Sequence, residues 1–249
     1  MKIVVCISHV PDTASRIKVG SDGKTIDPAG VTYIINPYDE YAVEEALKTK
    51  EKLGSGEVVV VTLGSENSKE TIRKALAMGA DSGVLLKDDN QRDSLGIAKA
   101  LAEEIKAQSS TLVFMGKQSV DYDNSIVGQL TAELLEYNCV TVCVKLEMNG
   151  EKIIAEREIE GGREIVETSM PAVITCQKGL NEPRYASLKG IMAAKKKTIE
   201  EKSAASYTPT SEVVGMHLPA GKQPGRIVGS DASAVPELVR LLKEEAKVI

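Results

Sequence analysis

The feature that most constrains the fold is an alternation of strand and helix patterns over the first 135 residues. Apolar, β-branched runs of strand length occur at 2–7, 57–63, 82–87 and 111–115, and helical patterns lie between or after them at 37–53, 68–78, 93–107 and from 126 onward. Strands that alternate with helices pair in parallel through right-handed crossovers. The sequence therefore predicts an α/β fold with a mostly parallel, doubly wound sheet.

The pattern changes after Tyr137, where strands follow one another without helices between them. Asn149-Gly150 and Gly161-Gly162 are typical two-residue hairpin turns, which predicts an antiparallel extension of the sheet. A run rich in Ser, Thr, Gly and Pro follows Thr198, and a helical pattern closes the chain. We expect a nucleotide-binding domain over 1–180, a protruding loop over 181–197, and a C-terminal arm over 198–249 whose helix needs a partner surface.

Composition and charge exclude several classes of protein. The net charge of −5 and the aromatic content of 3%, without Trp, argue against nucleic-acid binding. No apolar run has the length that a membrane span needs, so we expect a cytoplasmic protein without membrane insertion. Two histidines are too few for a zinc site. Cys6, Cys139, Cys143 and Cys176 lie in apolar runs, so we expect buried, reduced thiols, with Cys139 and Cys143 on one face of a strand.

Ligands of a doubly wound sheet bind beyond the carboxyl ends of its strands, where the strand order reverses. The loops after Ile7, Leu63 and Met115 emerge at that edge, and the helix start at Asn36 is expected beside them. In segment 116–132, four good N-cap residues precede the helix: Asp121, Asp123, Asn124 and Ser125. A helix N-terminus binds anions through free N–H groups and partial positive charge, which suggests a nucleotide phosphate here.

The residues alone leave alternatives open at each of these places. From the loop in 116–132 alone, an ordinary capped turn is favoured, since such turns are commoner than phosphate sites. Asp121 and Asp123 would also repel a phosphate unless they face elsewhere. Asn36 is either a plain N-cap or a ligand contact. In 181–197, Tyr185 and Leu188 lie in a polar segment before three lysines. That segment is either a docking surface for an acidic partner or a connector packed on its own domain.

Several segments together resemble the β subunit of electron transfer flavoproteins. The signature of that family is present as Ala155-x-Arg157, Glu160-Gly-Gly-Arg-Glu-x-Val166 and Pro171-x-Val-Ile-Thr175. Four further segments match the family: INPYDEYAVEEAL at 35–47, IRKALAMGAD at 72–81, GKQSVDYDNSIVGQLTA at 116–132 and NEPRYASLKGIMAAKKK at 181–197. The resemblance runs from the first strand to Lys197.

The resemblance implies a fold similar to the adenine-nucleotide α-hydrolase type and an electron carrier rather than an enzyme. It implies a heterodimer with an α subunit that holds FAD, and electron transfer from dehydrogenases such as acyl-CoA dehydrogenases of fatty acid β-oxidation to a quinone oxidoreductase. It also implies a structural AMP in this subunit, bound by Cys6, Asn36, Pro37, Tyr38, Asp39, Leu63, Ser119, Val120, Asp121, Tyr122, Asp123, Asn124, Ser125, Ile126, Val127, Gly128, Gln129 and Leu130. The partner-recognition residues that it implies are Pro183, Arg184, Tyr185, Leu188, Ile191, Met192 and Lys195, with Leu188 as the anchor.

Three alternatives remain at this stage. A bifurcating relative would hold a second FAD in place of AMP. An ATP-using enzyme of the same fold would carry a Ser/Gly-rich phosphate loop after the first strand, and Ser8-His9-Val10-Pro11 is not one. A stand-alone nucleotide-binding stress protein would not need the long arm after Thr198.

Overall fold

The expected alternation of strands and helices is present in the structure, a computed structural model that describes residues 1–222 and 224–249. The alternating part consists of β1 (Lys2–Cys6), α1 (Pro37–Leu53), β4 (Glu57–Gly64), α2 (Lys69–Met78), β5 (Ser82–Lys87), α3 (Ser94–Gln108), β6 (Leu112–Gly116) and α4 (Val127–Leu135). It is followed by β7 (Asn138–Asn149), β8 (Lys152–Ile159), β9 (Gly162–Ser169), β10 (Ala172–Cys176), α5 (Leu188–Ala194), β11 (Ile199–Ser203) and α6 (Val235–Glu244). The short strands β2 (His9–Pro11) and β3 (Tyr33–Ile35) pair separately, and 3-10 turns span Glu66–Ser68 and Ala232–Ala234.

The main sheet has the strand order β11-β5-β4-β1-β6-β10-β7-β8-β9 within the described residues. The strands from β11 to β7 are parallel, and β8 and β9 extend the sheet as antiparallel strands. From β1 the chain proceeds to β4 on one side, and from β6 it proceeds to β7 on the other. The order therefore reverses between β1 and β6, and the predicted fold class is confirmed.

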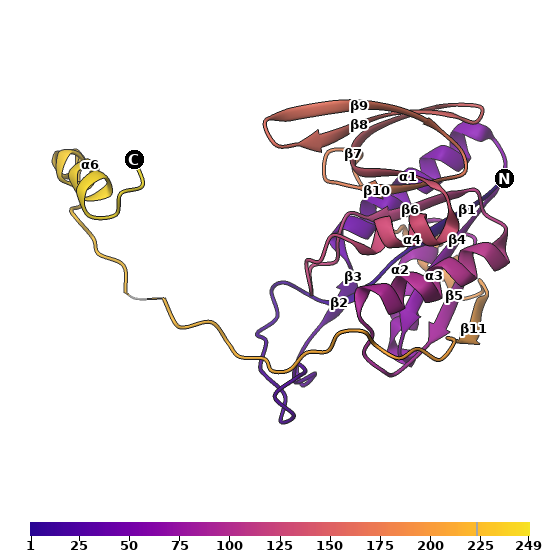
Figure 1. Ribbon diagram of the computed structural model, residues 1–249, viewed down its shortest axis with the longest axis horizontal. Coiled ribbons are helices and arrows are strands. Elements are labelled where there is room, and N and C mark those ends of the chain that lie inside the picture. The colour runs from indigo at the N-terminus through magenta and orange to yellow at the C-terminus, as the bar shows by residue number, and fades with distance from the viewer. Residues whose placement is uncertain (223) are drawn as a thin grey trace.

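Helices cover both faces of the parallel sheet (Figure 1). On one face, Ile3 and Val5 of β1 pack with residues of α1 and α2, and on the other, Val4 and Cys6 pack with residues of α3 and α4. Because both faces are buried, the central strands are almost continuously apolar. The strand ends where the order reverses remain accessible, and a site can form there.

The expectation for the cysteines is wrong at one position. Cys139 is exposed, whereas Cys6, Cys143 and Cys176 are buried, and all four are free. The cause is a bulge in β7: Val142 has a φ of +56°, and the register with β10 shifts by one residue there. An extra residue reverses the alternation of a strand. Cys139 and Cys143 therefore face opposite sides.

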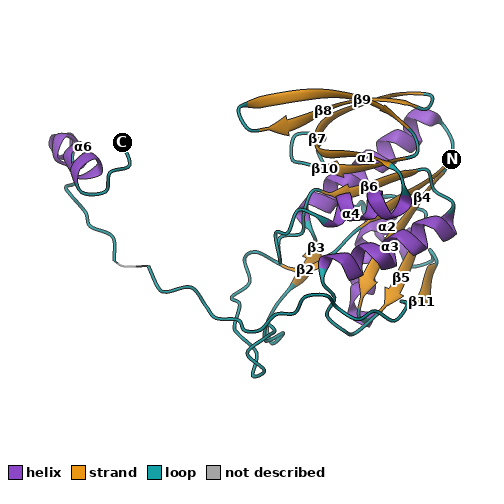
Figure 2. Cartoon of the chain, in the orientation of Figure 1, coloured by secondary structure: helices purple, strands orange, loops and turns teal. Residues whose placement is uncertain are grey.

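The C-terminal arm, predicted over 198–249, begins with a strand that the sequence analysis did not predict. Ile199–Ser203 forms β11, an edge strand parallel to β5, which the charged sequence IEEKS did not suggest. Beyond it, the chain extends away from the sheet and carries α6 far from the other elements (Figures 1 and 2). No residue of α6 is buried, and Val235, Leu238 and Val239 are each about half exposed. Across 1–222 and 224–249, no helix combines the length and apolar character needed to cross a membrane.

Candidate functional site

A cavity of about 170 Å³ opens at the carboxyl ends of β1 and β6, where the strand order reverses. Its polar part comes from the turns after these strands and from the start of α4, and its apolar part comes from β1, β4, β6 and α3. The lining residues are Cys6, Ile7, Ser8, His9, Asp39, Leu63, Ser94, Ile97, Leu101, Met115, Gly116, Lys117, Gln118, Ser119, Asp121, Tyr122, Asn124, Ser125, Ile126, Val127 and Gly128.

Asn36 connects the start of α1 to the loop after β6. Its side chain is fully buried and makes no capping hydrogen bond to α1. Instead, its Nδ2 donates to the carbonyl of Gln118 at 2.8 Å, and its Oδ1 accepts the N–H of Val120 at 3.2 Å. Both backbone partners belong to the segment that lines the cavity. Asn36 therefore occupies the N-cap position of α1, but its side chain holds the loop instead of capping the helix. The ligand contact expected of Asn36 stays a prediction.

Asp39 connects the two strand ends. One carboxylate oxygen accepts the N–H of Ser8 at 2.7 Å, and the other accepts the N–H of Gly116 at 2.9 Å. Burial raises the pKa of this carboxyl to about 7, although the hydrogen bonds oppose the shift. A Cβ at Gly116 would lie 2.3 Å from Asp39 Oδ1, so the close approach requires glycine there. The turns after β1 and β6 are thus held at a fixed separation.

The acidic side chains of the loop between β6 and α4 are satisfied within the loop. Asp121 accepts the hydroxyl of Ser119 and the N–H of Tyr122, and Asp123 accepts the side-chain amide of Gln118. These bonds orient the two carboxylates but leave their charge in place, and Asp121 lines the cavity. A phosphate at the start of α4 would therefore have to lie away from Asp121.

The start of α4 has the properties of an anion site. Its N-cap residue, Ile126, makes no side-chain capping bond, and Asp123 and Ser125 adopt left-handed conformations instead of capping the helix. The first N–H groups of a helix lack intrahelical acceptors and carry partial positive charge. The side chain of Gln129 donates to the carbonyl of Ser125, while its buried Oε1 has no partner among the described groups. The free N–H groups fit a phosphate, and Gln129 Oε1 would accept a hydrogen bond from a donor beside it.

Most of the predicted nucleotide-binding residues line the cavity. Those outside the lining are Asn36, Pro37, Tyr38, Val120, Asp123, Gln129 and Leu130. Sequence reasoning missed Ile7, Ser8 and His9 after β1 and Ser94, Ile97 and Leu101 on α3. His9 stacks on Tyr33 with ring centroids 4.6 Å apart, and burial lowers its pKa. Ile7, Ser8 and His9 could have been found from the sequence, because they follow a predicted strand. Ile97 and Leu101 have the spacing of ordinary core residues, so the sequence does not mark them as site residues.

The segment 181–197 is held rigidly but exposes its apolar side chains. Arg184 donates to both carboxylate oxygens of Glu44 on α1, and Asn181 donates to Glu45. Tyr185 is 99% exposed and Leu188 is 84% exposed. Of the predicted recognition residues, Arg184 therefore anchors the segment, while Tyr185, Leu188, Ile191 and Met192 are presented to solvent. Pro183 and Lys195 lie in the same segment.

Within the described ranges, no group of His, Cys, Asp and Glu residues could hold a metal ion. Burial raises the pKa of the Cys6 thiol, so it lines the cavity as a neutral apolar group. The site offers hydrogen-bond donors and apolar walls, which suit binding.

A family model described as electron transfer flavoprotein domain matches residues 24–207. The chain is 42% identical to the electron transfer flavoprotein subunit beta of Bradyrhizobium diazoefficiens over 253 residues, which covers all of both chains. It is 41% identical to the corresponding subunit of Bacillus subtilis over 260 residues, again covering all of both chains. For the subunit of Mus musculus the identity is 38%, over all of this chain and 99% of the relative. The chain therefore belongs to the electron transfer flavoprotein family, with the likeness running over the whole length of its β subunits.

Proposed function

We propose that the chain is the β subunit of a heterodimeric electron transfer flavoprotein and that it buries one AMP as a structural ligand. The α subunit would hold the redox-active FAD, and the chain would take part in electron transfer without breaking or forming bonds itself. The observation that carries this proposal is the full-length likeness to β subunits, together with a cavity at the reversal of strand order.

The lining of the cavity supports a mononucleotide. The start of α4 would hold the phosphate, and the apolar side chains of Leu63, Ile97 and Leu101 would cover the base. A second FAD, as in a bifurcating relative, has a second nucleotide and a three-ring flavin. The described lining accounts for one phosphate and one base, and FAD would need further contacts beyond it.

The test of the ligand is mass spectrometry of the small molecules that are released when the purified heterodimer is denatured and filtered. We expect about one AMP and one FAD per heterodimer. Two FAD and no AMP would replace the AMP assignment by the bifurcating alternative. Adding AMP at 100 times its dissociation constant to stripped protein should stabilise it by about 2.7 kcal/mol, visible as a rise in Tm. An unchanged Tm would contradict a binding site.

The segment 181–197 supports a role in docking an electron-donating dehydrogenase. Tyr185, Leu188 and Met192 form an exposed apolar surface on a segment that polar bonds fix to α1. Exposed apolar side chains on a rigid support are typical of the anchors at protein interfaces. We propose that electrons from a dehydrogenase of the acyl-CoA type reach the FAD of the α subunit through this contact and pass on to a quinone oxidoreductase.

The test of the docking surface is Leu188→Ala, measured as the rate of electron acceptance from candidate dehydrogenases. We expect acceptance to slow at least about tenfold, because interface anchors contribute about 2 kcal/mol or more. Leu53→Ala is the matched control, since Leu53 is a 50% exposed leucine at the end of α1. Assembly with the α subunit should remain intact in both variants. Equal rates for wild type and Leu188→Ala with every dehydrogenase would refute the docking role.

The rival functions are separable by the same preparations. An ATP-using enzyme of this fold would hydrolyse or transfer part of ATP, which the purified chain should not do. A stand-alone stress protein would be stable without an α subunit, whereas α6 exposes Val235, Leu238 and Val239 in the single chain. A stable, inert monomer would count against the heterodimer.

A further inference from the structure

A second cavity, of about 550 Å³, lies away from the candidate nucleotide site, at the amino-terminal edge of the sheet. It is bounded by the second half of α1 on one side and by β7 and the turn into β8 on the other. Its lining includes none of the residues proposed for AMP or for partner recognition. Its volume falls within the range of about 300–1,000 Å³ that is usual for small-molecule sites.

The floor of the cavity is apolar and adaptable. Leu146, Met148, Met170 and Leu180 line it, and all four are partly buried where they pack on the sheet core. Methionine side chains are unbranched and polarizable, so they accommodate an aliphatic chain in several conformations. A floor of this kind suits a flexible hydrocarbon tail better than a rigid polar ring.

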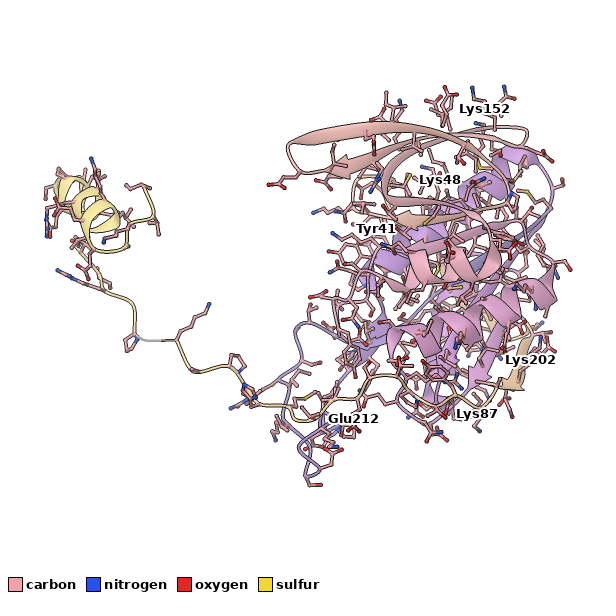
Figure 3. All side chains as sticks on the ribbon, viewed as in Figure 1. Tyr41, Lys48, Lys87, Lys152, Lys202 and Glu212 are labelled. Atoms are coloured by element: carbon pink, nitrogen blue, oxygen red, sulfur yellow. The ribbon has the colours of Figure 1, made fainter. Side chains whose placement is uncertain are left out.

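The rim of the cavity carries a net positive charge. Lys48 and Lys52 are exposed and lie one helical turn apart on the same side of α1. No carboxylate of the described residues forms an ion pair with either, whereas Lys145 across the cavity pairs with Glu147 and Glu156. Figure 3 shows Lys48 on α1 under the β7–β9 strands and Lys152 on the outer side of the same strands.

The acidic groups at the rim have other partners. Glu51 accepts from the guanidinium of Arg184, and Glu45 accepts the side-chain amide of Asn181. Burial raises the pKa of Glu45, whereas the Asn181 amide and the charges of Lys48 and Lys52 oppose the shift. With Glu51 and Lys145 paired elsewhere, Lys48 and Lys52 face the single charge of Glu45 in the lining. The positive charge that remains matches a monoanion better than a phosphate dianion.

We propose that this cavity binds an aliphatic carboxylate, with its tail on the apolar floor and its carboxylate between Lys48 and Lys52. The site shares no lining residue with the AMP cavity or with the docking segment, although Asn181 and Arg184 of that segment bond to its rim. The proposal therefore does not depend on which nucleotide the chain buries. It predicts an affinity that grows with tail length and depends on the two lysines.

The experiment titrates the delipidated complex of the chain and its α subunit with octanoate and decanoate by calorimetry. We expect one saturable site per chain, with about fourfold tighter binding for each added methylene, since burial of a CH₂ is worth about 0.8 kcal/mol. Lys48→Ala combined with Lys52→Ala should weaken decanoate about tenfold, because it removes two exposed ion pairs of about 0.7 kcal/mol each. Lys152→Ala removes the same charge from the outer face and should leave binding unchanged.

A decanoate with a diazirine at its tail gives an independent measurement. Irradiation should label peptides that contain Leu146, Met148 or Met170, and unlabelled decanoate should compete. Absence of saturable binding, equal affinity in the double variant, or labelling elsewhere would each overturn the proposal. It would also be overturned if decanoate bound only the isolated chain, because the cavity would then belong to the interface with the α subunit.

Discussion

The root of the C-terminal arm is fixed by a single carboxylate at the start of α3. Asp93 caps the helix by accepting the N–H of Gly96 at 2.8 Å, and it also accepts the Tyr207 hydroxyl at 2.9 Å. Its second oxygen accepts the N–H and the hydroxyl of Thr210 and the N–H of Ser211. Burial raises the pKa of Asp93, but these hydrogen bonds outweigh it and the net pKa is lowered. The carboxylate is therefore ionised at neutral pH.

The substitution Asp93→Ser separates the cap from the arm contacts. Serine caps helices about as well as aspartate, so α3 should lose little stability. The second oxygen is removed, and with it most of the four hydrogen bonds to Tyr207, Thr210 and Ser211. At about 0.5–1 kcal/mol for each of the three bonds to the second oxygen, the arm root loses about 1.5–3 kcal/mol. Local opening of the arm should then become about 10- to 150-fold more frequent.

The assay is hydrogen exchange measured by mass spectrometry on peptides that cover 204–213 and α3. In Asp93→Ser, the amides of Thr210 and Ser211 should exchange faster by the predicted factor, while α3 stays as protected as in the wild type. Asp89→Ser is the matched control, because Asp89 is an exposed neighbour in the same loop. The reasoning fails if the arm exchanges equally in wild type and variant, or if α3 and the arm lose protection together.

Three further predictions concern two buried positions and the partly exposed Arg184. Asp39→Asn should flatten the pH dependence of stability: the raised pKa of about 7 means that Asp39 favours folding below its unfolded pKa and loses this contribution as pH rises through 7. Between pH 4 and pH 7, the free energy of unfolding measured by chemical denaturation should fall by up to about 4 kcal/mol more in wild type than in the variant. Parallel pH curves for the two proteins would contradict this. Gly128→Ala places a Cβ 2.4 Å from Thr175 Cγ2 and should lower the free energy of unfolding by about 1–3 kcal/mol, measured by thermal unfolding. If steric overlap is the cause, adding Thr175→Ser should restore part of that stability. Arg184→Lys cannot maintain the paired bonds to Glu44, and should destabilise by about 1–2 kcal/mol with faster exchange over 181–187, whereas unchanged protection would show that the pairing is unimportant.

The sequence was sufficient for the central sheet because its signals are local. The runs at 2–7 and 57–63 are long, apolar and β-branched, and any other placement would expose them. The start of α1 at Asn36-Pro37 was equally clear, since proline favours the first helical turn. Strand β11 was missed because Glu200, Glu201 and Lys202 dominate it. Charged residues are common on edge strands, which makes such strands look like loops.

The candidate site was only partly predictable because tertiary contacts, which leave no local sequence pattern, position its residues. Asn36 has the sequence position of an N-cap, yet its side chain bonds to Gln118 and Val120, which are more than 80 residues away. Ile97 has the spacing of a core residue of α3, and only the packing of α3 against the cavity reveals that it lines a site. The bulge at Val142 likewise depends on how β7 meets β10, which no local pattern specifies.

These contacts indicate how the site is prepared for a ligand. Asn36 and Asp39 fix the turns after β1 and β6 through backbone N–H and carbonyl groups, and Asn124 donates to Ser94 to join the same loop to α3. The frame of the cavity is therefore held by the protein's own polar bonds. The start of α4 is different, because its first N–H groups have no side-chain cap among the described residues. A bound phosphate would satisfy groups that the frame leaves open, so ligand removal should loosen the start of α4 and its loop while the parallel sheet stays protected from exchange.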